Sequence, residues 1–283
     1  MNPWVVVRCH NDAWVVGETL AGIARQAMPR RVAVYDNESS DGSAEIARPL
    51  ADKLVNIPKG TYVPGRVLNQ AMRETDGEIV VFLNSDCVPQ DEHWLDELVK
   101  PLEDERVCAT FGRQVPRPEC LPLFAKDTED TFGDGSRQRF WKHCFSMASS
   151  AVRRSVWEAM PFREDIQYSE DVDWTWRACQ AGHEIRYAPR LIAMHSHNYS
   201  LRQWRRRQFG EGKADAAIFE WTPYERSLLR YSLMPLARQV LSDARFALRA
   251  GKPSALLHTV PLRTVQMLGR RKGFNEGWRE RQG

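Results

Sequence analysis

Acidic residues recur in this sequence directly after short apolar runs. Asp36 follows the run Arg31–Tyr35, and Asp86 closes the stretch Asn84-Ser85-Asp86 that follows Glu78–Leu83. A carboxylate in such a place suits a hard cation such as Mg²⁺ or Mn²⁺, which proteins hold with few carboxylates and with substrate phosphates. Asp86 is therefore a candidate metal ligand, although an aspartate after a strand is also common turn chemistry.

The polar loop Asp36–Gly42 has two interpretations. Its Asp, Asn and Ser residues are typical of a turn that caps the following helix. Alternatively, Asp36 accepts a hydrogen bond from the ring N–H of a pyrimidine, and Asp41 supports the ribose or the loop itself. Because carboxylates repel phosphate, a nucleotide diphosphate bound here needs a positive partner, which a cation at Asp86 would supply.

Two further groups carry titratable side chains. The acidic residues of Glu170-Asp171-Val172-Asp173 favour the start of a helix, where Asp173 can pair with Arg177, but one of them could also serve as a general base. His195 and His197 are two residues apart, so on a strand they face the same side. They are either ordinary histidines or, beside a metal-carboxylate loop, metal ligands.

The first half of the chain alternates short apolar strands with helical patterns. Expected strands cover residues 4–8, 31–35, 53–57 and 78–83, and expected helices cover 15–27, a segment from Ser43, and 67–74. This alternation indicates a parallel sheet with helices on both faces. In such sheets ligands bind at the carboxyl ends of the strands, which here carry Cys9–Asp12, Asp36–Asp41 and Asn84–Asp86.

The second half is less regular at first and then becomes helical. Pro116–Lys142 is predicted to be a long loop or lid with some helix. A periodic pattern returns over 145–152, and a helix is expected over 170–181. Strands are expected at Glu184–Tyr187 and Leu191–His195. Beyond Tyr199 helices are expected over 201–220, 224–250 and 254–268, interrupted by Gly251, Pro253 and Pro261.

Composition limits the class of protein. The 283 residues are 42% hydrophobic and 27% charged, which suits one large domain or two smaller ones and excludes a disordered chain. The six cysteines include no CxxC pair, so free thiols are expected. No apolar run reaches the roughly 20 residues of a spanning helix, and the N-terminus lacks the pattern of a secretory signal. We therefore expect a cytoplasmic protein.

Charge is distributed unevenly along the chain. Residues 201–283 carry 17 Lys and Arg against 7 Asp and Glu, whereas residues 1–200 carry 23 against 30. A basic region of this kind attracts anionic surfaces. Its interleaved aromatic and leucine residues favour peripheral attachment to the inner face of an anionic membrane. A solvated helical face packed on the catalytic part and a homodimer contact are the alternatives.

The motifs in their order resemble a known family. The runs VVVRCHND, VYDNESSDGSAEI, GRVLNQAM, EIVVFLNSDCVP, YSEDVDWTWRACQAGHEIRYAP and HSHNYS are similar to glycosyltransferase family 2 over about residues 4–200. Its members are inverting enzymes with the GT-A fold, a Rossmann-like α/β fold with a mostly parallel sheet. EDVDW and HSHNYS look most like bacterial rhamnosyltransferases. The resemblance implies a GT-A catalytic domain over residues 1–200 and a basic helical region over 201–283.

The resemblance also implies roles for single residues. Asp36 and Asp41 fall at nucleotide-binding positions, and Asp86 falls at the metal-binding aspartate of the DxD motif. Asp171 matches the catalytic base of the ED motif, and His195 matches the C-terminal metal ligand.

Other residues are candidates beside these. His197 is a second imidazole ligand, and Glu170 or Arg177 would orient the base or help to close the site. The matching motifs add five nucleotide-binding candidates, namely Arg8, Asn11, Asn69, Asn84 and Ser85. Asn84 replaces the first aspartate of the DxD motif, so the metal would have one carboxylate fewer.

The implied reaction is displacement at the anomeric carbon of a nucleotide-diphosphate sugar, with Mg²⁺ or Mn²⁺ as cofactor. dTDP-rhamnose is the expected donor and another UDP- or dTDP-sugar the alternative. The expected acceptor is a glycan or lipid-linked glycan of a cell-surface polysaccharide. A nucleic-acid-binding protein acting through the basic region is the rival from another class. The acidic loops would repel a phosphate backbone, so no nucleic-acid partner is expected.

Overall fold

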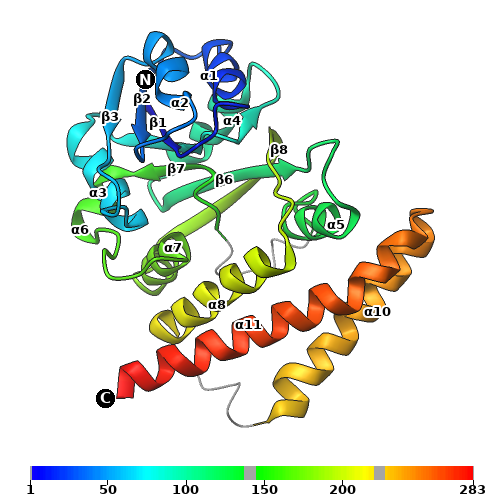
Figure 1. Ribbon diagram of the computed structural model, residues 1–283. Helices are drawn as coiled ribbons and strands as arrows, with labels where there is room; N and C mark the ends of the chain where they lie inside the picture. Colours follow the sequence, from blue (N-terminus) through cyan, green and yellow to red (C-terminus); the bar gives the residue numbers. More distant parts are fainter. Residues whose placement is uncertain (1, 137–144, 220–226, 283) are drawn as a thin grey trace. The chain divides into compact units, whose positions relative to one another are not determined.

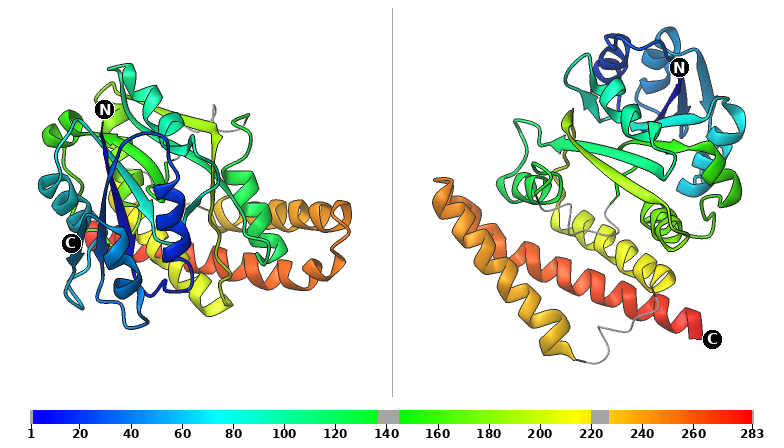
Figure 2. Two further views of the ribbon diagram at one scale, coloured as in Figure 1. Left: turned by 90° about the horizontal axis from the view of Figure 1, so that it is seen from above. Right: turned by 180° about the vertical axis from the view of Figure 1, so that it is seen from behind.

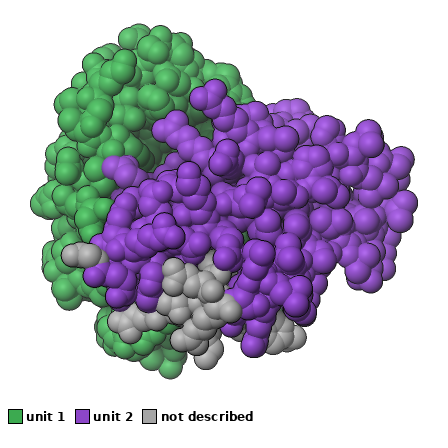
Figure 3. Space-filling view, turned by 60° about the horizontal axis from the view of Figure 1, so that its bottom comes forward, with its two compact units in different colours: residues 1–117, 128–165, 170–196 green, residues 118–127, 166–169, 197–283 purple. Residues whose placement is uncertain are grey.

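The computed structural model describes residues 2–136, 145–219 and 227–282, which form two compact units (Figure 3). Unit 1 comprises Met1–Arg117, Thr128–Asp165 and Glu170–Ser196, and unit 2 comprises Pro118–Asp127, Ile166–Ser169 and His197–Gly283. Cys144, the end of the expected loop and the start of the helix expected at 224 lie outside the described residues. The described cysteines are all free thiols, as expected.

Unit 1 is built on one eight-stranded sheet (Figure 1). Its strands are β1 (Trp4–Cys9), β2 (Arg31–Asp36), β3 (Lys53–Asn56), β4 (Ile79–Asn84), β5 (Val88–Pro89), β6 (Val107–Val115), β7 (Ser149–Arg153) and β8 (Glu184–Met194). Their order is β3-β2-β1-β4-β7-β6-β8-β5. The half with β1 to β4 is parallel, as is the β6–β8 pair. The pairs β4–β7, β6–β7 and β5–β8 are antiparallel, so the sheet is mixed.

Helices cover both faces of this sheet (Figures 1 and 2). They are α1 (Val16–Ala24), α2 (Ser43–Ala47), α3 (Pro64–Glu74), α4 (Trp94–Val99), α6 (Arg154–Ala159) and α7 (Glu170–Gln180), with the 3₁₀ turns η1 (Arg48–Leu50) and η2 (Lys100–Glu103). Helix α5 (Pro122–Thr131) has residues in both units. It supplies the helical part expected within Pro116–Lys142.

The strands form where they do because each is apolar on both sides. In β1, Val5 and Val7 join a core with α1 and α4, whereas Val6 joins a second core with α3, α6 and α7. In β4, Val81 and Phe82 divide in the same way, and all of these side chains are fully buried. A strand buried on both faces needs such a continuous apolar run, which explains why it could be predicted from the sequence.

Two features of the sheet differ from the expectation. Strands β5 and β6 had not been predicted, and the two strands expected at residues 184–187 and 191–195 are one strand, β8. The pairing of β6 with β8 shifts register between Gly112 and Arg113, so residues 189–191 of β8 bulge. The bulge contains Pro189, which lies between the two expected strands.

Unit 2 is helical. It contains α8 (Leu201–Ile218), a π-helical turn η4 (Leu229–Leu233), α10 (Met234–Arg249), a 3₁₀ turn η5 (Pro253–Ala255) and α11 (Leu256–Gln282). The expected interruption at Pro261 is wrong, because α11 continues through it. Pro261 lies near the start of the helix, where the missing N–H removes only one backbone bond. Within the described residues no helix is both long and apolar enough to cross a membrane.

The helices α8 and α11 lie side by side (Figures 1 and 2). Glycines make this possible, because a Cβ at Gly269 or Gly277 would lie 2.8 Å from the carbonyl oxygen of Arg205 or Lys213. A separate ion network joins α11 to α10 and α5. Arg263 donates to Asp243 at 2.7 and 3.0 Å and to Asp127 at 2.7 Å.

Candidate active site

The carboxyl ends of β1, β2 and β4 meet at one edge of the sheet. In the parallel ladder Cys9 pairs with Asp36, and Arg8 pairs with Asn84. The three loops that follow these strands therefore start side by side, although they are far apart in the sequence. This arrangement brings together most of the residues that the sequence analysis selected.

The loops after β1 and β2 are tied to each other through Asn11 and Asp36. Asp36 is buried and accepts hydrogen bonds from the Ser39 N–H at 2.9 Å and from its hydroxyl at 2.6 Å. Asn11 donates its N–H to the Ser39 hydroxyl at 2.8 Å and accepts from the Ser40 N–H at 2.8 Å. Asn11 adopts φ +55°, a conformation that Asn tolerates. Ser39 thus links the two residues in one hydrogen-bond network.

Asp41 organises the same loop. Its carboxylate accepts from the Ser43 hydroxyl at 2.5 Å and from the backbone N–H of Ala13 at 2.9 Å. The Ser43 hydrogen bond lowers the pKa of Asp41. Asp41 thus carries out the turn-stabilising role that the sequence left open, and its support of a ribose stays a prediction.

The loop after β4 joins Ser85 to a carboxylate that had not been selected. The Ser85 hydroxyl donates to Asp12, and the Ser85 N–H donates to the carbonyl of Arg8 at 2.9 Å. Burial raises the pKa of Asp12, and the nearby Asp86 carboxylate also raises it. Two carboxylates thus lie close to each other here, which favours binding of a cation.

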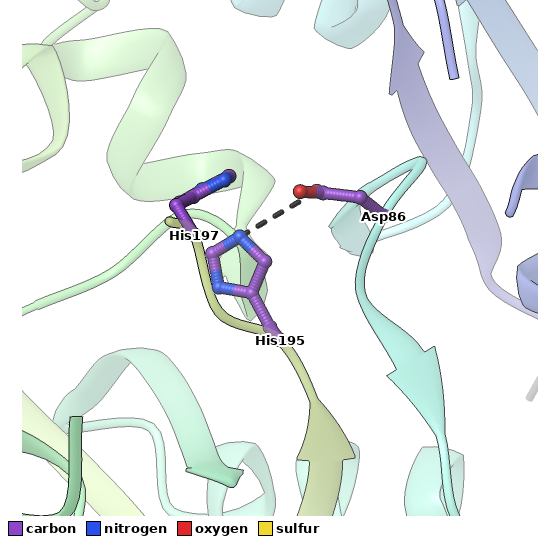
Figure 4. A group of neighbouring side chains, drawn as sticks. All are labelled: Asp86, His195 and His197. Atoms are coloured by element: carbon purple, nitrogen blue, oxygen red, sulfur yellow. Dashed lines mark ion pairs between the residues drawn. The ribbon is translucent and has the colours of Figure 1, made fainter. Parts of the chain in front are cut away.

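Asp86, His195 and His197 form a candidate metal centre (Figure 4). Each offers one ligand atom, and these atoms lie within 4.8 Å of one another. Asp86 and His195 belong to unit 1, with Asp86 Oδ1 3.5 Å from His195 Nε2. His197 follows His195 by two residues and is the first residue of that segment of unit 2. A carboxylate with two imidazoles is a donor set suited to a divalent transition metal such as Mn²⁺.

Gln114 at the end of β6 orients His195. Its Oε1 lies 2.7 Å from His195 Nδ1, and its Nε2 donates to the Ser146 hydroxyl at 2.9 Å. Because an amide oxygen only accepts, Nδ1 carries the proton, and in neutral imidazole Nε2 then presents its lone pair beside Asp86. A histidine held in this way by its second nitrogen is typical of metal ligands. The residues therefore fit a metal ion.

Arg117 places a positive charge beside the same loop. Its guanidinium donates to the backbone carbonyl of Asp86 at 2.8 Å and lies 4.7 Å from the ring centroid of Trp14. Its N–H donates to the Ser196 hydroxyl at 2.9 Å. Arg117 is buried, so this charge is fixed near Asp86.

Arg8 connects the Asp86 loop with helix α7. Its guanidinium donates to Asn84 Oδ1 at 2.9 Å and to Glu170 Oε1 at 3.0 Å. Burial lowers the pKa of Arg8, but Tyr62 and Glu170 outweigh this effect, so the arginine stays charged. Asn84 provides the acceptor that Arg8 needs without adding a carboxylate.

Asp171 lies next to this ion pair at the start of α7. It accepts hydrogen bonds from the backbone N–H groups of Val172 at 2.8 Å and Met147 at 3.1 Å. Burial raises its pKa to about 6, and repulsion from Glu170 contributes, while the two hydrogen bonds and Arg8 act in the opposite direction. A carboxyl group with such a pKa can exchange a proton near neutral pH.

Two selected residues have structural contacts instead. Arg177 donates to Asp173 at 2.8 Å and to the carbonyl of Pro161 at 2.9 Å, which is the helix pairing considered above. Asn69 is buried, and both its donors and both lone pairs of its oxygen are used. Its partners are Phe162, Glu164 and Trp157. Asn69 therefore has no hydrogen-bonding capacity left for a nucleotide, and the expectation for this residue is corrected.

The sequence analysis missed Asp12, Gln114 and Arg117. The last two follow the run Val107–Phe111, an apolar strand that ends in polar residues. The same signal revealed Asp36 and Asp86, so Gln114 and Arg117 could have been selected from the sequence. The pairing of Gln114 with a histidine 81 positions away could not.

Known proteins resemble this chain in sequence. A model of the family described as Glycosyl transferase family 2 matches residues 4–159. The O-antigen chain rhamnosyltransferase WbaN of Salmonella anatum is 29% identical over 199 residues, which are 65% of this chain but only 62% of WbaN. The O-antigen chain rhamnosyltransferase RfbN of Salmonella typhimurium is 27% identical over 225 residues, 74% of this chain and 70% of RfbN. The expected resemblance to rhamnosyltransferases is thus confirmed.

A solved structure agrees in fold. The mannosyltransferase PcManGT from Pyrobaculum calidifontis, in complex with GDP-Man and Mn²⁺, has a TM-score of 0.66 and 20% identity, covering 100% of this chain and 89% of that chain. The likeness confirms the expected GT-A architecture, followed by a helical C-terminal region.

Replacing Gln114 tests the metal centre. In Gln114→Leu the Nδ1–H of His195 loses its acceptor, so we expect the affinity for Mn²⁺ to fall about 10–100-fold. Gln114→Glu keeps an acceptor oxygen and should retain most of the affinity. Calorimetric titration with MnCl₂ measures both. Equal affinities of Gln114→Leu and the wild type would contradict this role of Gln114.

Replacing Asn69 tests its structural role. Asn69→Ala leaves the Trp157 indole N–H and the Phe162 backbone groups without partners, so the free energy of unfolding should fall by about 3 kcal/mol. Urea denaturation measures this loss, with the exposed Asn56→Ala as control. The affinity of the folded variant for UDP or dTDP should not change. Unchanged stability with weakened nucleotide binding would restore Asn69 to the nucleotide site.

Proposed function

The chain belongs to glycosyltransferase family 2, and on that premise we propose that it transfers a sugar, with inversion, from a nucleotide diphosphate to an acceptor hydroxyl. One observation carries this proposal: the Arg8 guanidinium bonds to Asn84 of the metal loop and to Glu170 beside Asp171. The candidate base and the candidate metal ligands thus flank one arginine.

Asp171 is the proposed general base. Its carboxylate takes the proton of the acceptor hydroxyl while the hydroxyl oxygen bonds to the anomeric carbon. The bond from this carbon to the phosphate oxygen breaks at the same time, and the nucleoside diphosphate leaves with the electron pair. Because attack comes from the face opposite the leaving group, the configuration inverts. Arg8 and Glu170 hold the start of α7, and Arg177 supports it through Asp173.

The leaving group is the place where positive charge is needed. Asp86 and His195 would hold a Mn²⁺ or Mg²⁺ ion, with His197 as a third ligand. When bound, such an ion neutralises the negative charge that develops on the diphosphate. Arg117 adds a fixed positive charge beside Asp86, which strengthens stabilisation of the departing anion.

The proposed donor is dTDP-rhamnose. The buried Asp36 suits a pyrimidine ring N–H, with Asn11, Asp41 and Ser85 around the same loops. The names of the similar proteins WbaN and RfbN favour rhamnose. The proposed acceptor is a glycan or lipid-linked glycan of a surface polysaccharide. The words "O-antigen chain" in both names are consistent with such a glycan. Another UDP- or dTDP-sugar is the second candidate.

A donor panel tests the proposal. We expect dTDP-rhamnose to bind more tightly than UDP-glucose and GDP-mannose when binding is measured by calorimetry with Mn²⁺. Asp86→Ala should remove the part of the affinity that depends on Mn²⁺, whereas Asp91→Ala, at an exposed position nearby, should not. Preference for GDP-mannose would refute the pyrimidine site. Metal-stimulated binding that survives in Asp86→Ala would remove Asp86 as a ligand.

The pH profile tests the base. Asp171 acts only when ionised, so turnover should rise with pH and level off above about 6, the pKa to which burial raises this carboxyl. Asp171→Asn should lower kcat about 10²–10⁴-fold and abolish this limb of the profile. Donor binding should stay near normal, and Asp165→Asn, an exposed aspartate before α7, serves as control. Near-normal turnover of Asp171→Asn would refute the assignment.

A further inference from the structure

We propose that the turn between α10 and α11, with the flanking ends of both helices, docks on an anionic phospholipid surface. This inference concerns unit 2 alone and goes beyond the transfer reaction. We call this part the hairpin surface and define it by exposed side chains, the apolar Leu241, Leu248, Leu257 and Val260 and the basic Arg238, Arg245, Arg249 and Lys252.

The apolar members are unusually exposed. Leu257 is 78% exposed and Leu248 is 68% exposed, while Val260 is 57% and Leu241 is 50% exposed. Along α10, Leu241 and Leu248 are seven residues apart and lie on the same face. Along α11, Leu257 and Val260 are three apart and again share a face. Exposed apolar side chains that share a face of a helix favour an interaction site.

Backbone hydrogen bonds close the turn itself. Gly251 adopts φ +65°, the left-handed conformation that ends a helix, and the Lys252 N–H donates to the carbonyl of Ala247 at 2.9 Å. The Ala255 N–H then donates to the carbonyl of Lys252 at 3.0 Å. The leucines on both sides of the turn are therefore presented by a defined backbone.

The exposed charge of the hairpin surface has a single sign. Between residues 227 and 275 the only acidic residue in the sequence is Asp243. Asp243 is fully buried, where Arg263 and Lys126 lie at 2.7 and 3.3 Å from its carboxylate. The four basic side chains of the hairpin surface are therefore not offset by an exposed carboxylate from this segment. This pattern is complementary to anionic headgroups.

The combination of leucines and arginines favours one kind of binding partner over two others. A nucleic acid would satisfy the arginines but would leave the leucines without an apolar partner. A second copy of the same surface would cover the leucines but would bring positive charges together. The interface of an anionic bilayer accepts both, since apolar side chains enter the acyl boundary while the arginines stay among the headgroups.

Vesicle sedimentation of the full chain tests the proposal. We expect the protein to sediment with phosphatidylglycerol vesicles at low salt and not with phosphatidylcholine vesicles. Arg245→Gln with Arg249→Gln should lower the partition coefficient about thirtyfold. Leu248→Ser with Leu257→Ser should lower it at least about tenfold. All four changes are at exposed positions, so circular dichroism should show an unchanged fold.

Matched controls separate this surface from general basicity. Arg205→Gln with Arg206→Gln removes the same charge from exposed positions of α8, and Leu121→Ser removes an exposed leucine elsewhere in unit 2. These controls should bind as the wild type does. The proposal is refuted if the intact protein fails to bind phosphatidylglycerol or if controls and hairpin variants lose binding equally. Retention of duplex DNA that survives the leucine changes, or dimerisation abolished by them, would assign the surface to those partners instead.

Discussion

The site depends on one cation whose side chain is only 12% exposed. Arg8 sits at the carboxyl end of β1, where its neighbour in the ladder is Asn84, and its guanidinium reaches both Asn84 and Glu170. An arginine removed from water is costly unless its donors are used and a carboxylate balances its charge. Both conditions fix Glu170 and therefore the first turn of α7. The environment of Asp171 follows from this, because repulsion from Glu170 and attraction to Arg8 both act on it.

The same constraint gives a reason for Asn84. The resemblance to the family led us to expect an aspartate at this position, and its replacement suggested a weaker metal site. In the structure the Asn84 oxygen accepts from Arg8, which is a contact that needs no charge. The candidate ligands for a metal ion are Asp86 and His195, and the Asp12 carboxyl lies near Asp86. This edge of the sheet therefore still carries two carboxyl groups, Asp86 in the same loop and Asp12 in the loop after β1.

Residues at strand ends could be predicted from the sequence, whereas contacts across the fold could not. β1, β2 and β4 are apolar on both faces, so their ends, and with them Asp36 and Asp86, were evident from local patterns, whereas Arg8 was selected through the family resemblance. Asn69 was misjudged because its partners Phe162 and Trp157 lie about 90 positions away in the sequence. Its own motif therefore does not reveal that its side chain is buried. Gln114 was missed for a related reason, since its role arises from the pairing of β6 with β8.

The glycines of α11 have a consequence for the alignment of the two long helices. Gly269, Gly273 and Gly277 recur every four residues and face the carbonyls of Arg205, Phe209 and Lys213, which recur at the same interval. After a slip of one turn, two of these carbonyls would still face a glycine, but the third would face Val265 or Arg281, whose side chain does not permit so close an approach. The ion pairs are less selective, because Arg270 lies 2.7 Å from Asp215 and 3.2 Å from Glu211, one turn away, and Lys213 likewise reaches Glu280 at 2.6 Å and Glu276 at 3.8 Å. The three glycines therefore set both the close approach of the two helices and their alignment, and the ion pairs add attraction without selecting the alignment.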